Sequence, residues 1–403
     1  MLMMVVECSP EILRLSQGEG ATSAGAFAAH AGDSSRRFLV SPDADDVVGG
    51  LISDLESSSV ESQRRAAMEL RLLAKHSADN RLRIARAGAI APLVALLSHP
   101  DPLLQEHGVT AILNLSLCDD NMELIAAAGA VRHLVRALRS GTPQARENSA
   151  CALLHLAQTD DLRASIGRAG AIPPLVALLE TGGARGKKDA ATALFSLLAA
   201  DENKLRAVEA GVVRPLLDLM ADPQSGMVDK AAYVLYEVVS SPDGRAAAVE
   251  ESAIPVLVEM VESGSRRQKD LAMLSLLEIC EASAAYRRMV VREGAIPPLI
   301  ALAQNASKKN MKQKVENLTS FTPNYFQYYF IVLIIYSPRL IKTGGGVGRA
   351  LATADRTINL CSPIGSARLV HERELSDVVA IAIDLPRGGA GDAHGIYCSR
   401  PLN

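Results

Sequence analysis

The sequence predicts an all-α solenoid, in which short helices stack as repeats along one axis. A phrase of ten residues recurs six times, and successive copies begin 41, 41, 41, 41 and 42 residues apart. A stack imposes such a period, because each unit presents the same apolar face to the next. Apolar residues make up 48% of the 403 residues but aromatic residues only 3%, which favours small aliphatic side chains between closely packed helices. The copies begin at Gly88, Gly129, Gly170, Gly211, Ser252 and Gly294.

Each repeat is predicted to contain three helices, short, medium and long. In the copy around Gly129, a short apolar segment at 121–128 precedes the glycine, which tolerates the backbone angles of a sharp turn. The segment 130–140 then places its leucine and valine residues at helical spacing. After a Gly-Thr-Pro turn, the segment 144–158 is expected to form the third and longest helix.

Proline marks the first turn of the second helix in most repeats. A missing backbone N–H costs little there, because the first amides of a helix have no partner within it. The copy around Gly129 departs from the pattern with His133. The first unit is partial, because 47–55 and 61–77 supply only a second and a third helix. The prolines are Pro92, Pro173, Pro174, Pro215, Pro255, Pro297 and Pro298.

Composition divides the chain into three parts. Residues 1–45 are rich in Ser, Gly and Ala without sustained periodicity, so we expect them to be disordered. Residues 46–318 carry about seven repeats, the first and last incomplete or altered. From 319 to 403 the period is lost and aromatic residues cluster, so we interpret this stretch as a divergent tail, disordered or produced by an altered exon boundary.

Three phrases resemble the armadillo repeat. They are GAIPPLVALL from Gly170, VTAILNLSLCDDN from Val109 and NMELIAAAG from Asn121. The resemblance covers about 47–318, and this segment is similar to the armadillo regions of plant U-box proteins. It implies a right-handed superhelix whose third helices line a concave groove. No segment of this sequence resembles the U-box itself, the fold that recruits a ubiquitin-conjugating enzyme.

The third helices contain polar positions inside an otherwise apolar frame. The resemblance places Asn114 where armadillo groove asparagines hold the backbone of an extended peptide. Positions 41 residues apart, and those one and two turns earlier, share one stripe of the helices. This stripe is either a partner-binding groove, the interpretation we favour, or an ordinary solvated face. The candidate groove residues are Asn114, His155, Ser196, Glu237, Glu278, Thr110, Thr192, Tyr233, His107 and Asn148.

Two departures from the family pattern bear on the ligand. Importin-α-type proteins pair the groove asparagine with a tryptophan, and this chain has no tryptophan. Recognition of a classical nuclear localisation signal is therefore disfavoured. The row that starts at Asn114 and His155 ends at Glu237 and Glu278, which predicts a ligand with basic residues at one end.

The sequence offers no catalytic, cofactor or metal site. The glycine run 344–348 lacks the Gly-Lys-Ser/Thr ending of a phosphate loop, and we interpret it as a linker. His99 and His107 lack further ligands at metal spacing, and the six cysteines contain no CxxC pair. The paired acids at 119–120 and 160–161 recur at one repeat position, so we interpret them as helix starts. A net charge of -3 does not favour nucleic acid as a partner. The apolar run at 328–336 is too short to span a bilayer, so a membrane is not favoured either.

These observations predict a non-enzymatic scaffold that binds segments of partner proteins in its groove. The resemblance implies a plant protein that acts in signalling linked to the ubiquitin pathway. The alternative is a component or substrate adaptor of a U-box-type E3 ubiquitin ligase. We expect a monomer in the cytoplasm, the nucleus or both.

Overall fold

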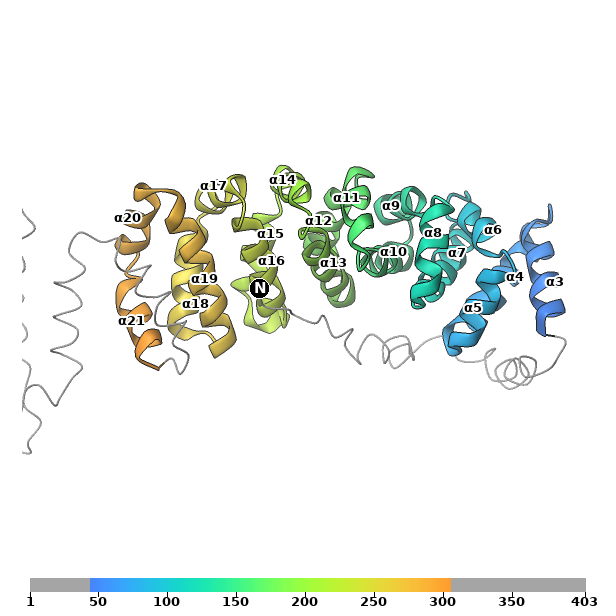
Figure 1. Cartoon of the computed structure of the whole chain (residues 1–403), viewed down its shortest axis with the longest axis horizontal. Coiled ribbons are helices and arrows are strands. Elements are labelled where there is room, and N and C mark those ends of the chain that lie inside the picture. Colours follow the sequence, from blue (N-terminus) through green and yellow to red (C-terminus); the bar gives the residue numbers. More distant parts are fainter. Residues whose placement is uncertain (1–43, 306–403) are drawn as a thin grey trace, which may run out of the picture. The chain divides into compact units, whose positions relative to one another are not determined.

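The computed structural model describes residues 44–305, and all of its described helices belong to a stack of repeats (Figure 1). The partial first repeat consists of α3 (Ala44–Leu55) and α4 (Val60–His76). In each complete repeat three helices follow one another, as the sequence predicts. The expectations for 1–43 and for everything after 305, including the tail, lie outside the described residues.

The first helices of the repeats are short, and along the stack α11 contacts α14, which contacts α17. They run along the upper edge of the view in Figure 1 from α11 to α20. Asp119 and Asp120 open the 3₁₀ turn before α8, and Asp160 and Asp161 open α11, which confirms the paired acids as helix starts. The first helices are α5 (Ala78–Arg86), α8 (Met122–Ala127, after the 3₁₀ turn Asp119–Asn121), α11 (Asp160–Arg168), α14 (Asp201–Glu209), α17 (Pro242–Glu250) and α20 (Ala284–Arg292).

The second helices begin just after the repeated turn. The residue at the turn has a positive φ in every repeat, between 72° and 91° for the five glycines and 61° for Ser252. Within 44–305, Ser252 is the one non-glycine residue with a positive φ. This left-handed region of backbone conformation is disfavoured for residues that have a Cβ. All seven prolines predicted for this position lie in the first turn of a second helix. These helices are α6 (Ile90–Leu96), α9 (Ala130–Ser140), α12 (Ile172–Thr181), α15 (Val213–Met220), α18 (Ala253–Ser263) and α21 (Ile296–Asn305).

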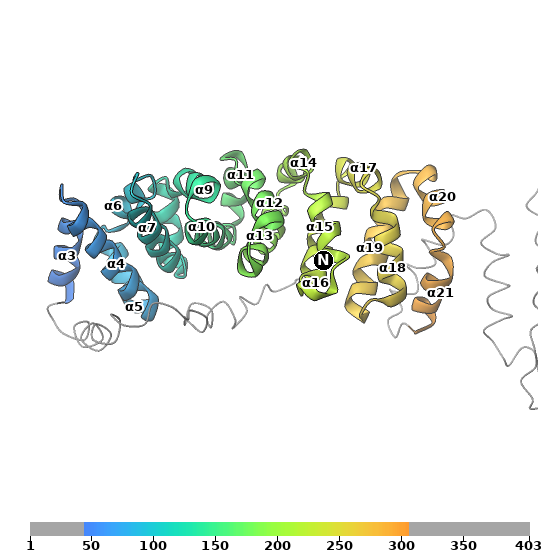
Figure 2. The same cartoon turned by 180° about the vertical axis from the view of Figure 1, so that it is seen from behind.

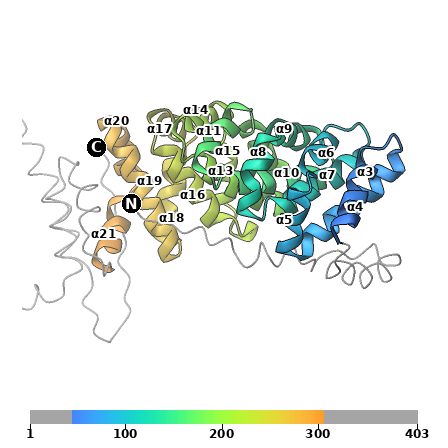
Figure 3. The ribbon, with the colours of Figure 1, turned by 45° about the vertical axis from the view of Figure 1, so that its right-hand side comes forward.

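The third helices form a continuous row, because α4, α7, α10, α13, α16 and α19 each contact the next. The same succession from α4 to α19 is seen from behind (Figure 2) and after a turn of 45° (Figure 3). A 3₁₀ turn at Pro223–Ser225 precedes α16. The third helices after α4 are α7 (Pro102–Leu115), α10 (Pro143–Leu156), α13 (Ala184–Leu197), α16 (Val228–Val239) and α19 (Arg266–Ala282).

Two buried asparagines join neighbouring repeats through their side-chain amides. The Nδ2 group of Asn121 donates to the carbonyl oxygens of Arg81 in the preceding first helix and Leu115 in the preceding third helix, both at 3.1 Å. Asn203 repeats this arrangement with Arg163 and Leu197, both at 2.9 Å. Each amide thus bonds one carbonyl oxygen at the C-terminal end of a third helix and one in the first helix of the preceding repeat. We call these two residues the asparagine clamps.

The core is a single cluster of small aliphatic side chains that continues through all the repeats. Leucine, alanine, valine and isoleucine supply nearly all of it, with methionine and cysteine at a few positions. Each repeat therefore buries its apolar surface against its neighbours, which is the physical basis of a solenoid. The buried polar side chains of the third helices, such as Asn114, Asn148 and His155, stand out against this uniform core.

Candidate functional site

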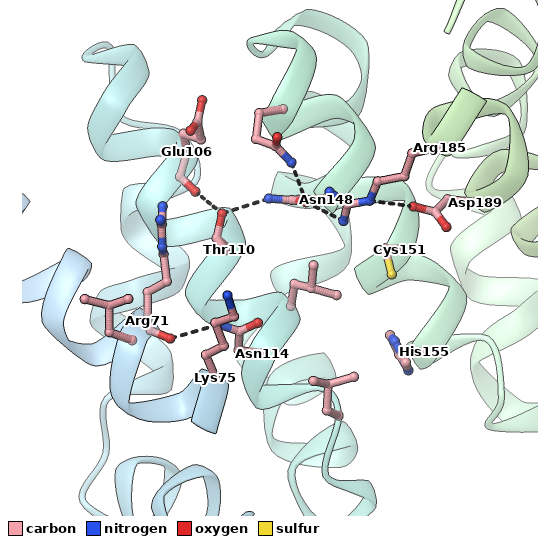
Figure 4. Close-up of a pocket in the computed structure, with 14 residues that line it drawn as sticks. Arg71, Lys75, Glu106, Thr110, Asn114, Asn148, Cys151, His155, Arg185 and Asp189 are labelled. Atoms are coloured by element: carbon pink, nitrogen blue, oxygen red, sulfur yellow. Dashed lines mark hydrogen bonds and ion pairs between the residues drawn. The ribbon is translucent and has the colours of Figure 1, made fainter. Parts of the chain in front are cut away.

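Four successive third helices, α4, α7, α10 and α13, enclose a pocket of about 290 Å³ (Figure 4). Its apolar floor includes Leu72, Leu113 and Leu117. A hollow that crosses four repeats offers one ligand contacts with several helices at once. Its polar lining residues are Arg71, Lys75, Glu106, Thr110, Asn114, Gln144, Asn148, His155, Arg185 and Asp189.

A chain of hydrogen bonds crosses the pocket from α13 to α7. Gln144 and Arg185 both donate to Oδ1 of Asn148 at 2.9 Å. The Nδ2 group of Asn148 donates to Oγ1 of Thr110 at 2.8 Å, and that hydroxyl donates to the carbonyl oxygen of Glu106 at 2.7 Å. These bonds hold Asn148 and Thr110 in fixed orientations, so both residues shape the wall of the pocket before any ligand arrives.

Asn114 is buried and its amide is engaged within the chain. Its Nδ2 group donates to the carbonyl oxygen of Arg71 on the preceding third helix at 2.8 Å. Only 6% of the residue is exposed. A partner backbone therefore meets an amide that already binds its own chain, and it must compete for that donor or use the remaining oxygen acceptor.

His155 and Asp189 are buried polar residues that each keep an atom without a hydrogen-bond partner. The atoms are Nε2 of His155 and Oδ2 of Asp189, although Nε of Arg185 lies 3.5 Å from the latter. Burial lowers the pKa of His155 to about 4, so its ring is neutral at pH 7. Burial raises the pKa of Asp189 to about 6, against the opposing charge of Arg185. Unsatisfied buried polar atoms are rare in native proteins and typical of sites that receive a ligand.

The structure brings four of the predicted groove residues together in this pocket, namely Thr110, Asn114, Asn148 and His155. His107 lies beside it, with Nδ1 at 3.0 Å from Nη1 of Arg71. The other five are on α13, α16 and α19 and do not line the pocket: Ser196, Thr192, Tyr233, Glu237 and Glu278.

The predicted residues on α16 and α19 are engaged with cations of the same chain. Oε2 of Glu278 lies 3.5 Å from Nη1 of Arg245. Burial raises the pKa of Glu237, and the charge of Lys204 opposes that effect. The hydroxyl of Tyr233 accepts from Nε of Arg267 at 2.6 Å, and the Arg267 guanidinium carbon lies 4.7 Å from the Tyr233 ring centroid. The acidic end predicted from the row is therefore partly neutralised from within.

The candidate groove rows omit Arg71 and Lys75, both on α4. A signal for them appears once the helices are aligned by their N-caps, Ser59 in α4 and Asp101 in α7. Arg71 and Lys75 then correspond to Leu113 and Leu117, which line the same pocket. Two cations in place of two leucines are the departure from the repeat that points to the pocket.

Other kinds of site have little support within 44–305. Histidine, cysteine and acidic side chains do not gather there in groups of three that could hold a metal ion. In that same part of the chain no single helix is long and apolar enough to cross a membrane. Among pairs of helices there, α11 and α12 together reach that length and apolar character, but they are bent by 84°.

Comparison with solved structures shows the armadillo fold. An engineered protein superposes with a TM-score of 0.61 at 25% identity, over 76% of this chain and 77% of that chain. A computationally designed armadillo repeat protein for modular peptide recognition gives a TM-score of 0.53 at 22% identity, over 57% of this chain and 99% of that one. The second likeness, at this identity, bears on the fold alone.

Short segments match curated plant proteins closely. U-box domain-containing protein 13 of Arabidopsis thaliana is 66% identical over 61 residues, 15% of this chain and 9% of that protein. E3 ubiquitin-protein ligase SPL11 of Oryza sativa subsp. japonica is 56% identical over 73 residues, 18% of this chain and 10% of that protein. The matched segments thus span about a tenth of these relatives. The family model of the plant U-box protein ARM repeat region matches residues 47–322, more than half of the sequence. The chain therefore belongs to the family of plant U-box protein ARM repeat regions.

Proposed function

We propose that this protein is a non-enzymatic scaffold that binds extended segments of partner proteins along its third helices. The observation that carries the proposal is the pocket that crosses α4, α7, α10 and α13. Its wall is fixed in advance by the bonds between Asn148, Thr110 and Glu106. A preformed surface loses little conformational entropy on binding, so many small contacts add up to useful affinity.

The comparisons support the class of ligand. A designed armadillo repeat protein, similar in fold at a TM-score of 0.51 and 22% identity, was solved in complex with the peptide (KR)4. An armadillo stack can thus hold a peptide, while the identity of this chain's partner depends on its own side chains. The matches to plant U-box proteins favour a role linked to ubiquitin. We further propose that this role is in signalling and that the protein is a monomer in the cytoplasm, the nucleus or both.

Photo-crosslinking from inside the pocket tests the proposal. Gln144 is exposed and lines the pocket, and Arg136 is also exposed but lies on α9 outside it. The full chain would carry p-benzoylphenylalanine at one of these two positions and would be irradiated in plant extract. We expect discrete protein adducts from position 144 that are absent from position 136. Equal adducts from both positions, or none from 144, would contradict a groove at this place.

The second candidate function is a substrate adaptor of a U-box-type ubiquitin ligase. The similarity to U-box protein ARM regions favours it. A reconstituted ubiquitination reaction separates the two functions. Ubiquitin chains formed by the isolated protein with a conjugating enzyme alone would contradict the scaffold function. Modification of a crosslinked partner only when a separate U-box ligase is added would support the adaptor.

A further inference from the structure

Arg71 and Lys75 are two cations one turn apart on α4, and both line the pocket. Within residues 44–305 neither forms an ion pair with a carboxylate, and Lys75 has no hydrogen-bond partner there. The Arg71 guanidinium instead meets Nδ1 of His107 at 3.0 Å. Burial and the charge of Arg71 lower the pKa of His107, so this ring is neutral at pH 7 and accepts the bond. The positive charge of Arg71 is therefore not balanced by its nearest neighbour.

The acids of the pocket are engaged elsewhere. Oε2 of Glu106 accepts from Oγ1 of Thr142 at 2.8 Å. The Glu106 carboxylate attracts the Arg71 guanidinium electrostatically but does not form an ion pair with it. Asp189, on the opposite wall, faces Arg185, with Lys188 and Lys230 also nearby. The α4 wall thus carries two cations without a matching anion, and burial lowers the pKa of Arg71, which shows that its charge is partly desolvated. A partly desolvated cation gains more from an anionic ligand than one in open solvent.

The repeat pattern makes the presence of these cations informative. Counted from their N-caps, Ser59 in α4 and Asp101 in α7, Arg71 and Lys75 correspond to Leu113 and Leu117. These two leucines line the same pocket, and on α4 the two cations are half-buried and line it as well. Lysine and arginine are not needed there for packing, since leucine fills both places in the next repeat.

We propose that the α4 wall of the pocket binds an acidic side chain of a partner segment, and that Arg71 and Lys75 select it. The inference rests on the proposed groove and names the chemistry of its ligand. A guanidinium engages a carboxylate or a phosphate through two parallel N–H bonds, while an ammonium adds a compact charge. Aspartate, glutamate and phosphoserine share this chemistry, so the test separates them.

Fluorescence anisotropy with peptide pools tests the inference on the full chain. Each pool holds extended peptides with uncharged residues and one fixed central residue, which is aspartate, phosphoserine, asparagine or lysine. We expect the aspartate or phosphoserine pool to bind about tenfold more tightly than the asparagine and lysine pools. The tighter of the two acidic pools identifies a carboxylate or a phosphate as the group recognised.

Charge reversal on α4 supplies the second arm. Arg71→Glu with Lys75→Glu is expected to remove the preference for acidic pools. The matched control is Arg132→Glu with Arg136→Glu, which reverses two exposed arginines at the same spacing on α9, outside the pocket lining. Because Arg71 contacts His107, the single Lys75→Glu variant is measured as well, and circular dichroism checks that each variant is folded. We expect the control to retain the preference and Lys75→Glu to lose much of it.

The outcomes distinguish this inference from the proposed function. If peptides bind and crosslink from position 144 but all pools bind equally, or the lysine pool binds best, the acidic-ligand inference is wrong and the groove stands. If no pool binds and position 144 gives no adducts, both are wrong. If the α9 control loses the preference as fully as the α4 variant, total charge rather than the pocket is responsible, which also overturns the inference.

Discussion

The third helices at the two ends of the described stack share a backbone frame but treat their charged side chains differently. On α4 the cations Arg71 and Lys75 face a hollow without an anionic partner. On α19 and its neighbours, Glu278 lies against Arg245, and Arg267 lies against Tyr233. The uniform repeat therefore supports one section whose charges are left for a ligand and another whose charges are satisfied internally.

This difference shows what a repeat can and cannot specify. The period fixes where a side chain stands, while the neighbouring repeats decide whether that side chain is free to bind. Because an internal ion pair must be broken before a partner can use it, a ligand gains more from the α4 section than from the α19 section. The predictions below test this contrast, beginning with the largest expected effects.

Asp189→Asn is expected to stabilise the protein by about 3 kcal/mol at pH 7.5, because it removes a buried carboxylate whose pKa is raised to about 6. The folded state holds the proton more tightly than the unfolded state. The native carboxyl therefore stabilises fully below pH 4, and the benefit disappears as pH rises through about 6. Urea unfolding at pH 7.5 and 4 measures both ends of this window. An equal effect at the two pH values would rule out this titration as the cause.

His155→Gln is expected to have the opposite pH dependence. Burial lowers the pKa of His155 to about 4, so the unfolded state binds the proton more tightly between pH 6.5 and 4. Stability from the neutral ring is complete above pH 6.5 and declines by about 3 kcal/mol as pH falls to 4. In the variant this decline disappears. The Asp189→Asn variant, which retains His155, serves as the control and keeps the decline.

Glu237→Lys with Glu278→Lys tests the predicted preference for basic residues at the α16–α19 end. If that end binds a basic residue, affinity for the lysine peptide pool falls about tenfold, or about 1.4 kcal/mol. Affinity for acidic pools is expected to stay the same, because neither residue lines the pocket. Anisotropy with both pools is the measurement. Unchanged affinity for basic peptides would show that Arg245 and Lys204 already satisfy these acids.

Tyr233→Phe gives the smallest expected effect. It removes the hydroxyl that accepts from Arg267 but keeps the ring and its cation–π contact. We expect a loss of about 0.5–1.5 kcal/mol in the free energy of unfolding and no change in peptide affinity. Thermal unfolding and anisotropy measure the two quantities. A loss of peptide binding in this variant would erase the distinction between the two sections.

Sequence reasoning accounts for most of the fold because each repeated feature has a local physical cause. The positive φ at Gly129 and its counterparts, and the proline after each of most turns, follow from steric rules that act within a few residues. The three helices of each repeat follow from apolar periodicity. Local rules of this kind transfer directly from the sequence to the structure.

The site is less accessible to such reasoning, because it depends on contacts between repeats. Asn114 lines the pocket, yet only the structure shows that its amide donates to Arg71 of the preceding repeat. The same holds for the burial that shifts the pKa values of His155 and Asp189 in opposite directions. Arg71 and Lys75 stand where the next repeat has Leu113 and Leu117, but only the packed helices show that these positions line a pocket.

The asparagine clamps have a mechanical consequence. Asn121 fastens α8 to α5, and Asn203 fastens α14 to α11. At the same position α11 has Leu162 and α17 has Gly244, neither of which has a side-chain amide. From α5 to α17, an asparagine amide therefore links successive first helices in every second pair only. Bending of the stack and the rate of backbone amide exchange are expected to vary with a period of two repeats, twice the period of the sequence.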